Sequence, residues 1–374
     1  MIRGILFNFL FFLSITTIAQ TYIVKGSVKD SNGELLPFAN VFFAETTYGT
    51  TTDNEGRFEL RIEKAGTYDL VVRFVGYRTY AAQIKLSDQR EYDLSITLEE
   101  DAITLGSVTV TGEKDERWQY NIQEFRYVFL GVSANARKCK IKNEDDVDFI
   151  EDEDAGILEA FSREPIIIEN KALGYLIKYY LEEFKIDYKS GMSSYYGYTS
   201  FEKLKGSKRQ ERRWEEARTK AYNGSIVHFF SSLYENKLKE EGFKVQIAQD
   251  VKGFGRVLNP READIGRELV VGNTELSKRL PFENYLYITY TKESESKDYS
   301  DYQSKFGGRH ASVSFEPKRP QQSWISIVEG YEDIEFEESG YVYNPIAFLS
   351  AGYWGFEKVA EMVPINYRPQ SENN

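Results

Sequence analysis

Thr52-Asp53-Asn54-Glu55-Gly56-Arg57-Phe58 is the turn at the centre of a run, residues 22–98, in which apolar and polar residues alternate. Alternate side chains of a strand point to the same face of a sheet, so this period predicts strands with one buried face. Asn32-Gly33 and Glu55-Gly56 place glycine where a reversing chain often needs a positive φ. About seven short strands in roughly 80 residues, without a helical run, predict a β-sandwich. The alternating apolar positions are Phe58, Leu60, Ile62; Tyr68, Leu70, Val72, Phe74; Tyr80, Ala82, Ile84, Leu86; and Tyr92, Leu94, Ile96, Leu98.

Several spaced motifs in this run resemble a known domain family. In chain order they are Gly26-Ser27-Val28-Lys29-Asp30, Gly33 through Pro37, Ala39-Asn40-Val41, Thr52-Asp53-x-x-Gly56-x-Phe58, Gly66-x-Tyr68 and Val75-Gly76-Tyr77. The run resembles the carboxypeptidase regulatory-like domain, a transthyretin-like β-sandwich of exported Bacteroidetes proteins. The resemblance implies a non-catalytic accessory module, which is the part this domain plays in carboxypeptidases.

The residues that a zinc carboxypeptidase needs are missing from the sequence. Such a site holds its metal with a His-x-x-Glu pair and a further histidine. Here Ser231 stands three residues after His228, and Val313 stands three residues after His310. His-Glu-x-x-His, Gly-x-Ser-x-Gly and the phosphate-binding P-loop are absent as well. We therefore predict no catalytic residue, no bound metal and no cofactor, and the sequence favours a non-enzymatic protein.

The first 19 residues have the pattern of a secretory leader. Arg3 gives a positive start, residues 5–15 form a short apolar core, and Thr17-x-Ala19 suits cleavage after Ala19. The apolar core is shorter than the ~20 residues that a membrane-spanning helix needs. We expect an exported protein, periplasmic or associated with the outer membrane, with no transmembrane segment after removal of the leader.

The net charge bears on the class of partner, and the cysteine content bears on disulfide formation. The formal net charge is −12, and phosphate contact depends on clustered Lys and Arg, so we predict no nucleic-acid partner. The basic residues between Lys203 and Lys220 are interleaved with glutamates, a pattern typical of a solvated helix. Cys139 is the one cysteine, so no internal disulfide can form, and we expect a small buried side chain.

Four segments are expected along the chain: a leader at 1–19, the sandwich at 20–100, a linker at 101–117, and an uncharacterised α+β domain at 118–370. Residues 105–112 are similar to the segment that joins the same sandwich to the plug of TonB-dependent outer-membrane receptors. Roughly 260 residues remain after this junction, too few for a plug and a barrel of about 22 strands.

Antiparallel strands and a helical hairpin are predicted in the second domain. Residues 173–188 and 194–204 alternate as strands, and residues 209–238 form a helical stretch broken at Asn223-Gly224-Ser225. Ser225 can cap the second helix, whose apolar stripe is Ile226, Phe229, Phe230 and Leu233. Trp214, Arg218 and Tyr222 stand four residues apart on one ridge, and His228 lies nearly opposite the apolar stripe. If the ridge is exposed, we predict that it contacts a partner; His228 is the further candidate for a binding role.

Residues 144–154 hold eight carboxylates in eleven positions. Two interpretations are open. The stretch is a solvated acidic loop, or it is a cation site, since carboxylate oxygens suit Ca²⁺. The spacing of a helix–loop–helix calcium site would need an oxygen donor where Ile150 stands, which favours the loop.

The leading hypothesis is an exported, non-enzymatic binding or assembly module of the cell envelope, with an envelope protein or a glycan as its partner. The first alternative is a hydrolase of envelope glycan or peptide without a recognisable motif, because 59 acidic residues offer many carboxylate pairs and His228 is available. The second alternative is an accessory protein related to TonB-dependent receptors. A deep pocket with converging Asp, Glu and His would favour the enzyme, and a shallow aromatic surface would favour binding.

Overall fold

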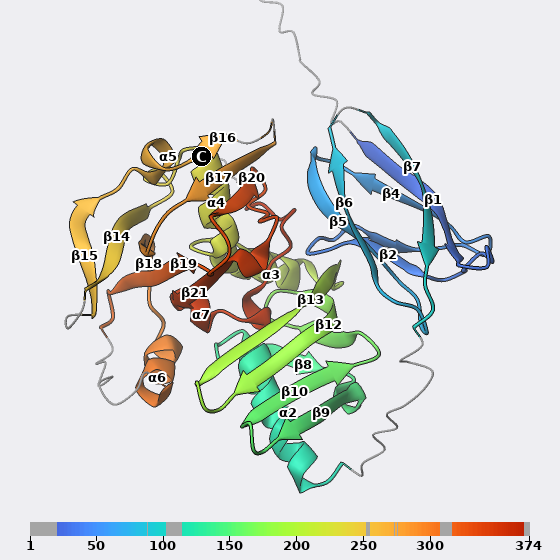
Figure 1. Cartoon of the computed structure of the whole chain (residues 1–374), viewed down its shortest axis with the longest axis horizontal. Helices are drawn as coiled ribbons and strands as arrows, with labels where there is room; N and C mark the ends of the chain where they lie inside the picture. The colour runs from blue at the N-terminus through green and yellow to red at the C-terminus, as the bar shows by residue number, and fades with distance from the viewer. Residues whose placement is uncertain are drawn as a thin grey trace, which may run out of the picture.

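The computed structural model describes residues 21–87, 89–101, 114–251, 255–272, 274, 276–306 and 316–369. The predicted leader and the junction at 105–112 lie outside these residues. Figure 1 shows three parts around a common centre: the amino-terminal sandwich, a sheet with a helix against it, and a carboxy-terminal part of two further sheets. The chain is mainly β with mostly antiparallel sheets, which confirms the predicted fold class.

The amino-terminal part is the predicted seven-stranded sandwich. One sheet has the order β4-β1-β7 and the other β3-β2-β5-β6, and β1 pairs with β7 in parallel. The alternating side chains Phe58, Leu60 and Ile62 are buried between the sheets, as the period predicts. The strands are β1 (Tyr22–Asp30), β2 (Asn40–Phe43), β3 (Gly49–Thr51), β4 (Arg57–Ile62), β5 (Gly66–Arg73), β6 (Tyr80–Leu86) and β7 (Glu91–Leu98).

The turn that opens β4 is held by an aspartate and a glycine. The Asp53 carboxylate accepts the backbone N–H groups of Glu55 and Arg57, at 2.9 and 2.8 Å. Gly56 has a φ of +65°, and a Cβ there would lie 2.9 Å from the carbonyl oxygen of Val28. The turn therefore needs glycine for its backbone conformation and for its close approach to β1.

The middle part is a six-stranded antiparallel sheet organised on β12. Strand β13 pairs with one edge of β12 along its whole length, while β10 and β11 pair with successive stretches of the other edge. Helix α2 (Glu116–Phe129), capped by Asp115, packs on the sheet through Ile122, Phe125 and Phe129. The strands are β8 (Cys139–Ile141), β9 (Val147–Asp152), β10 (Ile157–Ser162), β11 (Ile166–Asn170), β12 (Tyr175–Asp187) and β13 (Met192–Lys203), with 3-10 turns η1 (Ala136–Lys138) and η2 (Glu144–Asp146).

The carboxy-terminal part has a second core. Its larger sheet has the order β15-β14-β18-β19-β21 and its smaller sheet β16-β17-β20. The strands are β14 (Phe243–Val251), β15 (Gly255–Glu262), β16 (Val271–Gly272), β17 (Ser277–Pro281), β18 (Tyr285–Ser294), β19 (Pro320–Ile327), β20 (Asp333–Glu337) and β21 (Phe348–Gly352). The helices are α5 (Ile265–Glu268), α6 (Lys297–Phe306), α7 (Tyr353–Phe356), η3 (Pro345–Ala347) and η4 (Val359–Glu361).

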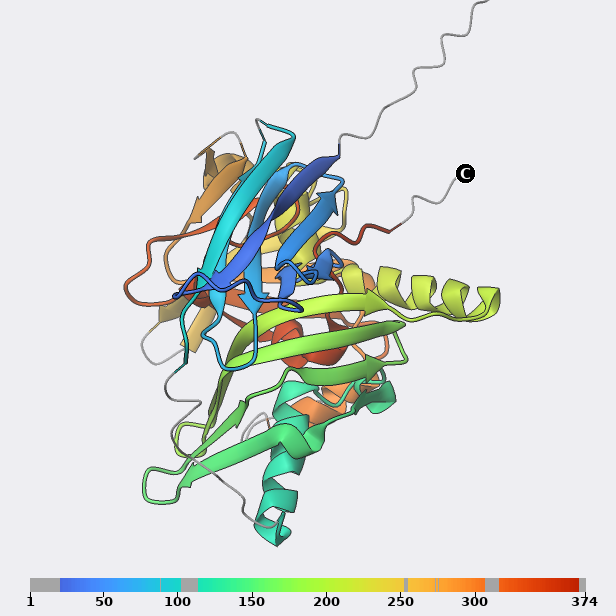
Figure 2. The same cartoon turned by 90° about the vertical axis from the view of Figure 1, so that its right-hand side faces the viewer.

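Two consecutive helices connect the middle and carboxy-terminal parts. Helix α3 (Lys208–Tyr222) begins with a capping box at Ser207, and α4 (Ile226–Tyr234) begins at the predicted cap Ser225, whose hydroxyl accepts the N–H of His228. In Figure 2, α3 projects from the body, and its first half is exposed. The end of α3 packs into the core of the middle part, whereas α4 packs into the carboxy-terminal core. The break at residues 223–225 is where the chain passes between the two cores.

The three parts make direct contacts. The backbone N–H of Thr67 donates to the Glu337 carboxylate, and the Thr67 hydroxyl lies 2.8 Å from the Tyr343 hydroxyl. A small apolar cluster joins the sandwich to β12 through Phe42, Ala44, Val71 and Tyr180. After α7 the chain returns to the middle part, where Val359 and Val363 complete its core.

The acidic stretch 144–154 is a strand over part of its length, so the loop interpretation is wrong for Val147–Asp152, which form β9. Its carboxylates pair with basic residues on or beside α2. Glu144 pairs with Arg126, Glu151 with Arg117, and Asp145 lies 2.8 Å from Lys114. The acidic residues therefore balance the basic face of the helix.

Candidate functional site

A cavity of about 870 Å³ lies where the three parts meet. Its walls come from the sandwich, from β12 and β13, and from the segment that follows β20. The exposed lining residues, among them Ala81, Gln83 and Glu183, form its rim. The volume is typical of a site for a small molecule. The titratable residues that line it are Glu45, Asp69, Glu183, Tyr195, Tyr196, Tyr198, Tyr341, Tyr343, Glu357, Lys358 and Glu361.

Glu45 projects into the cavity from the loop after β2. Its φ is +59°, a left-handed conformation that a non-glycine residue adopts at a cost. All three parts hold this backbone in place: the Glu45 N–H donates to the carbonyl of Thr199 at 2.7 Å, and the N–H of Ile365 donates to the carbonyl of Glu45 at 2.8 Å. Burial, and then the nearby Asp69, raise the pKa of the Glu45 carboxyl to about 7.

Asp69 lies close to Glu45 but has hydrogen-bond partners. The Tyr341 hydroxyl donates to Asp69 Oδ2 at 2.8 Å, and Gln83 donates to the Tyr341 hydroxyl at 3.0 Å. Burial raises the pKa of Asp69, while the hydrogen bonds from Tyr341 and Gln83 oppose that rise. The pair of carboxyls Glu45 and Asp69 therefore makes one side of the cavity acidic.

Another part of the wall comes from α7 and the chain after it. Glu357 ends α7 and is half-buried, and burial raises the pKa of its carboxyl well above the usual value, with further contributions from Glu361 and Glu293. Glu361 accepts hydrogen bonds from Ser133 and from Asn135, the second at 2.7 Å. Burial lowers the pKa of the Lys358 amine, which lies 5.9 Å from the centre of the Tyr195 ring.

The charges of the residues that line the whole cavity do not balance. Among the described residues, five carboxyl groups and one amine line the cavity. Moving a carboxylate out of water is costly unless a partner compensates it, so the carboxyls of Glu45 and Glu357 hold protons at neutral pH more strongly than free glutamates do. The arrangement can donate and accept hydrogen bonds, and it presents tyrosine rings beside acidic groups.

We predict that Glu45→Gln stabilises the protein at pH 8 and leaves its stability almost unchanged at pH 4. The folded pKa of Glu45 is raised above the unfolded value, so its contribution is fully present below pH ~4.5 and is lost as pH rises to about 7. A rise from 4.5 to about 7 corresponds to about 3 kcal/mol of lost stability above pH 7. Urea unfolding of both proteins at pH 4, 6 and 8 checks this. A difference between the two proteins that does not change with pH would contradict it.

The ridge predicted to face a partner, Trp214, Arg218 and Tyr222, is buried, so the condition of exposure is not met. Its polar groups bind the chain itself: the Trp214 indole N–H donates to the carbonyl of Lys171 at 3.0 Å, and Arg218 donates to the carbonyls of Leu173 and Gly174 at 2.7 and 3.1 Å. The ridge thus joins α3 to the turn between β11 and β12. A role in binding a partner stays a prediction.

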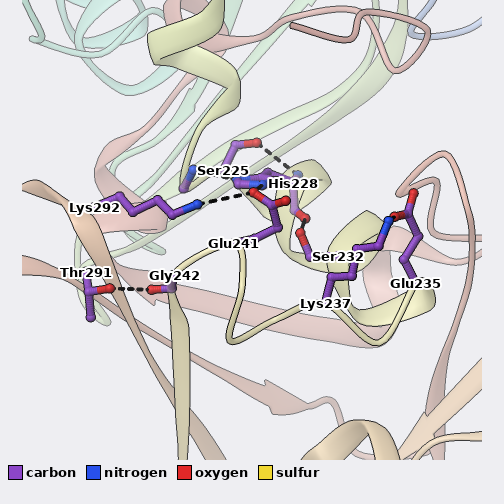
Figure 3. A network of polar contacts seen from close by, with 10 residues as sticks. Ser225, His228, Ser232, Glu235, Lys237, Glu241, Gly242, Thr291 and Lys292 are labelled. Carbon is purple, nitrogen blue, oxygen red and sulfur yellow. Dashed lines mark hydrogen bonds and ion pairs between the residues drawn. The ribbon is translucent and has the colours of Figure 1, made fainter. Parts of the chain in front are cut away.

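His228 is also buried, and Figure 3 shows its polar surroundings. Its Nδ1 accepts the backbone N–H of Gly224 at 3.0 Å, and its Nε2 lies 3.5 Å from Glu241, whose carboxylate is also 3.5 Å from Lys292. The rings of Tyr222 and Phe243 lie about 5 Å away. Burial lowers the pKa of His228 to about 4, although Glu241 opposes this. Both ring nitrogens are therefore directed at the chain, and His228 does not line the cavity.

Sequence reasoning missed the cavity residues. Glu45, Asp69, Glu357 and Glu361 are four of 59 acidic residues, and no spacing sets them apart. Glu45 and Ile365 are hydrogen-bonded although 320 positions separate them, so only the folded chain brings this site together.

Metal binding, membrane crossing and the cysteine complete the description of the residues that the structure covers. No group of three or more His, Cys, Asp and Glu side chains there is arranged to hold a metal ion. None of the helices in that part of the chain combines the length and the apolar character needed to cross a bilayer. The Cys139 thiol is half-buried, and burial, with a smaller effect of Glu361, raises its pKa to about 12.

Comparison with known proteins locates similarity in the amino-terminal part. The TonB-dependent receptor SusC of Bacteroides thetaiotaomicron is 37% identical over 101 residues, which are 27% of this chain and 9% of the receptor. This chain therefore spans under a tenth of the length of that receptor.

Solved structures with partial likeness include catechol 1,2-dioxygenase from Acinetobacter sp. ADP1, with 12% identity and a TM-score of 0.20 over 27% of this chain and 59% of the enzyme. Another is the type II cohesin–X-dockerin complex from Acetivibrio cellulolyticus, with 22% identity and a TM-score of 0.18 over 21% of this chain and 58% of that chain.

The family comparison agrees with the motifs from Gly26 to Tyr77. Residues 24–110 match the CarboxypepD_reg-like domain. The first part of this chain, the sandwich of β1 to β7, is therefore a CarboxypepD_reg-like domain.

Proposed function

We propose that this protein is an exported, non-enzymatic binding module of the bacterial cell envelope, and that the central cavity holds its ligand. The observation that carries the proposal is the pair Glu45 and Glu357, two half-buried carboxyls that line one cavity without a side-chain partner among the described residues. Leaving such groups unpaired costs stability, and such costs concentrate at functional sites.

The way the cavity is built also supports binding. Each of the three parts supplies part of its wall, and the sandwich reaches into it through Glu45 and Asp69. An accessory domain that completes a pocket has a direct reason to be kept on the chain. Binding at such a pocket would stabilise the contacts between the parts, because a ligand that binds only the assembled form favours that form.

The envelope location rests on two observations. The sequence of residues 1–19 has the pattern of a secretory leader, and the amino-terminal domain is similar to a part of the TonB-dependent receptor SusC. When the full sequence is expressed, we expect the protein to be recovered outside the cytoplasm, cleaved after Ala19, with Gln20 as its first residue. Deletion of residues 2–19 is expected to keep it in the cytoplasm.

The second candidate, an accessory protein of TonB-dependent receptors, is favoured by the 37% identity with SusC over 101 residues. In that case the sandwich would bring the protein to a receptor complex, and the cavity would be secondary. Cross-linking in cells separates the two. A receptor that cross-links through the sandwich and is lost when the sandwich surface is altered would favour this candidate.

The decisive experiment measures binding and turnover on the same purified protein. We expect envelope-derived glycan fragments and short peptides to be recovered intact, by mass spectrometry, after incubation, while at least one class raises the thermal unfolding midpoint. Glu45→Gln should remove that rise, and Glu55→Gln, an exposed position in the same domain, should keep it. Turnover of any of these compounds would replace the binding proposal with the hydrolase.

A further inference from the structure

We infer that the cavity binds a small organic cation, whose ammonium or guanidinium groups pair with the carboxyls of Glu45 and Glu357. This inference rests on the proposed function and names the class of ligand.

The lining carboxyls fall into two groups. Asp69 accepts from Tyr341, and Glu361 accepts from Ser133 and Asn135, so these two are satisfied by the chain. Glu45 and Glu357 are half-buried, and their side chains make no hydrogen bond or ion pair to the described residues. A buried carboxylate is compensated by a positive partner or by several hydrogen-bond donors. The cavity is where such a partner can be placed.

The geometry favours an organic cation over a metal ion. About 870 Å³ is far larger than one ion needs, and the described residues contain no set of three carboxylates arranged to hold a metal. Tyr195 and Tyr196 also line the cavity, and aromatic faces attract ammonium and guanidinium groups. Lys358 lies 5.9 Å from the centre of the Tyr195 ring, although burial lowers the pKa of its amine.

The same arrangement disfavours a neutral ligand. A neutral sugar could donate hydroxyl groups to Glu45, yet it would leave the repulsion between Glu45 and Asp69 uncompensated. A cation lowers the pKa of both carboxyls, so binding releases protons. We therefore expect affinity for the cation to rise between pH 5.5 and pH 8.

Other charged groups contribute to this pH dependence. In addition to burial, the charge of Asp69 raises the pKa of Glu45. The charge of Glu45 in turn adds to the effect of burial and raises the pKa values of Tyr179 and Tyr341. In addition to burial, the charges of Glu361 and Glu293 raise the pKa of Glu357. The charge of Lys220 lowers the pKa values of Glu293 and Glu361, against the larger effect of burial. Asp69, Glu293 and Glu361 have raised pKa values, so they titrate in the same direction as the two unpartnered carboxyls. Their titration strengthens the expected rise of affinity with pH.

The test is calorimetric titration of the full chain, purified after export, with matched charged and neutral probes. Agmatine carries a guanidinium and an amine, and glucosamine differs from N-acetylglucosamine by the loss of the acetyl group that neutralises its amine. We expect agmatine to bind at pH 8. The two sugars are compared at pH 6.5, where the glucosamine amine carries a proton, and N-acetylglucosamine is expected to bind at least about 10-fold more weakly than glucosamine, the range expected for losing a hydrogen bond to a charged group.

Substitutions of the two carboxyls test whether the cation binds in the cavity. Glu45→Gln and Glu357→Gln should each weaken agmatine binding by about 10-fold or more, while Glu55→Gln should leave it unchanged. Equal thermal midpoints or higher ones for the two cavity variants at pH 8 show that they are folded. The inference is overturned if no cation binds, if both cavity variants bind agmatine as the natural chain does, or if N-acetylglucosamine binds as well as glucosamine. Binding of the neutral sugar at the cavity would leave the proposed function standing, whereas turnover of a probe would remove both.

Discussion

Phe129→Ala is expected to lower the free energy of unfolding by about 3–5 kcal/mol, the usual cost of removing a fully buried aromatic ring from a core. Phe129 is the last residue of α2 and is completely buried. Its ring stacks on Phe125 with centres 4.7 Å apart and meets the edge of Tyr179 of β12 at the same distance. It also lies 5.4 Å from Tyr195, a residue of the cavity wall.

The cavity wall gives this variant a second effect. Loss of the ring leaves space behind Tyr195, so we expect weaker ligand binding even under conditions in which the protein remains folded. Urea unfolding followed by tryptophan fluorescence measures the first effect. Gln123→Ala, an exposed position of the same helix, is the matched control and should cost under about 1 kcal/mol. Equal stability of the two variants would show that α2 does not complete this core.

The sandwich could be predicted from the sequence because its physics is local. Each strand needs only alternation at period two, and each reversal needs a residue such as Gly56 at a positive φ. These patterns depend only on residues that are close together in the sequence. The same holds for the break between α3 and α4, where Ser225 supplies a cap that its own helix requires.

Helix α2 was not predicted, although Ile122, Phe125 and Phe129 have helical spacing and share its buried face. Its sequence is rich in Tyr, Phe and Val, residues that favour strands, and its charged residues include both glutamates and arginines. What stabilises it is the packing of Ile122, Phe125 and Phe129 on a sheet that forms from later residues, which is tertiary information. Propensity alone is a weak guide in such a case.

The candidate site shows the same limit more clearly. The spacing of Trp214, Arg218 and Tyr222 correctly placed them on one ridge, yet spacing cannot say which ridge of a helix faces the protein. The middle sheet covers it, and the exposed face of α3 carries the charges. The cavity depends on contacts such as Thr199 to Glu45, between loops and strands far apart in the chain. No pattern in the neighbouring residues records such a contact.

Gly174→Ala is expected to destabilise the protein by about 3 kcal/mol or more, because two independent costs add. Gly174 has a φ of +69°, and an alanine in this conformation costs about 1–2 kcal/mol. A Cβ there would lie 2.3 Å from Cδ2 of Trp214, so the indole and α3 must move. That movement breaks the hydrogen bonds of Trp214 and Arg218 to the turn and overpacks a buried site.

Gly191→Ala separates the two costs, because the turns at the two ends of β12 have the same design. Asn170 accepts the N–H groups of Ala172 and Leu173 before Gly174, and Asp187 accepts those of Lys189 and Ser190 before Gly191. The φ of Gly191 is +71°, yet a Cβ there meets nothing within 4 Å. Gly191→Ala should therefore cost only the conformational part, about 1–2 kcal/mol. The difference between the two variants in urea unfolding measures how firmly Trp214 fixes α3 on the sheet, and equal losses would show that the indole moves aside without cost.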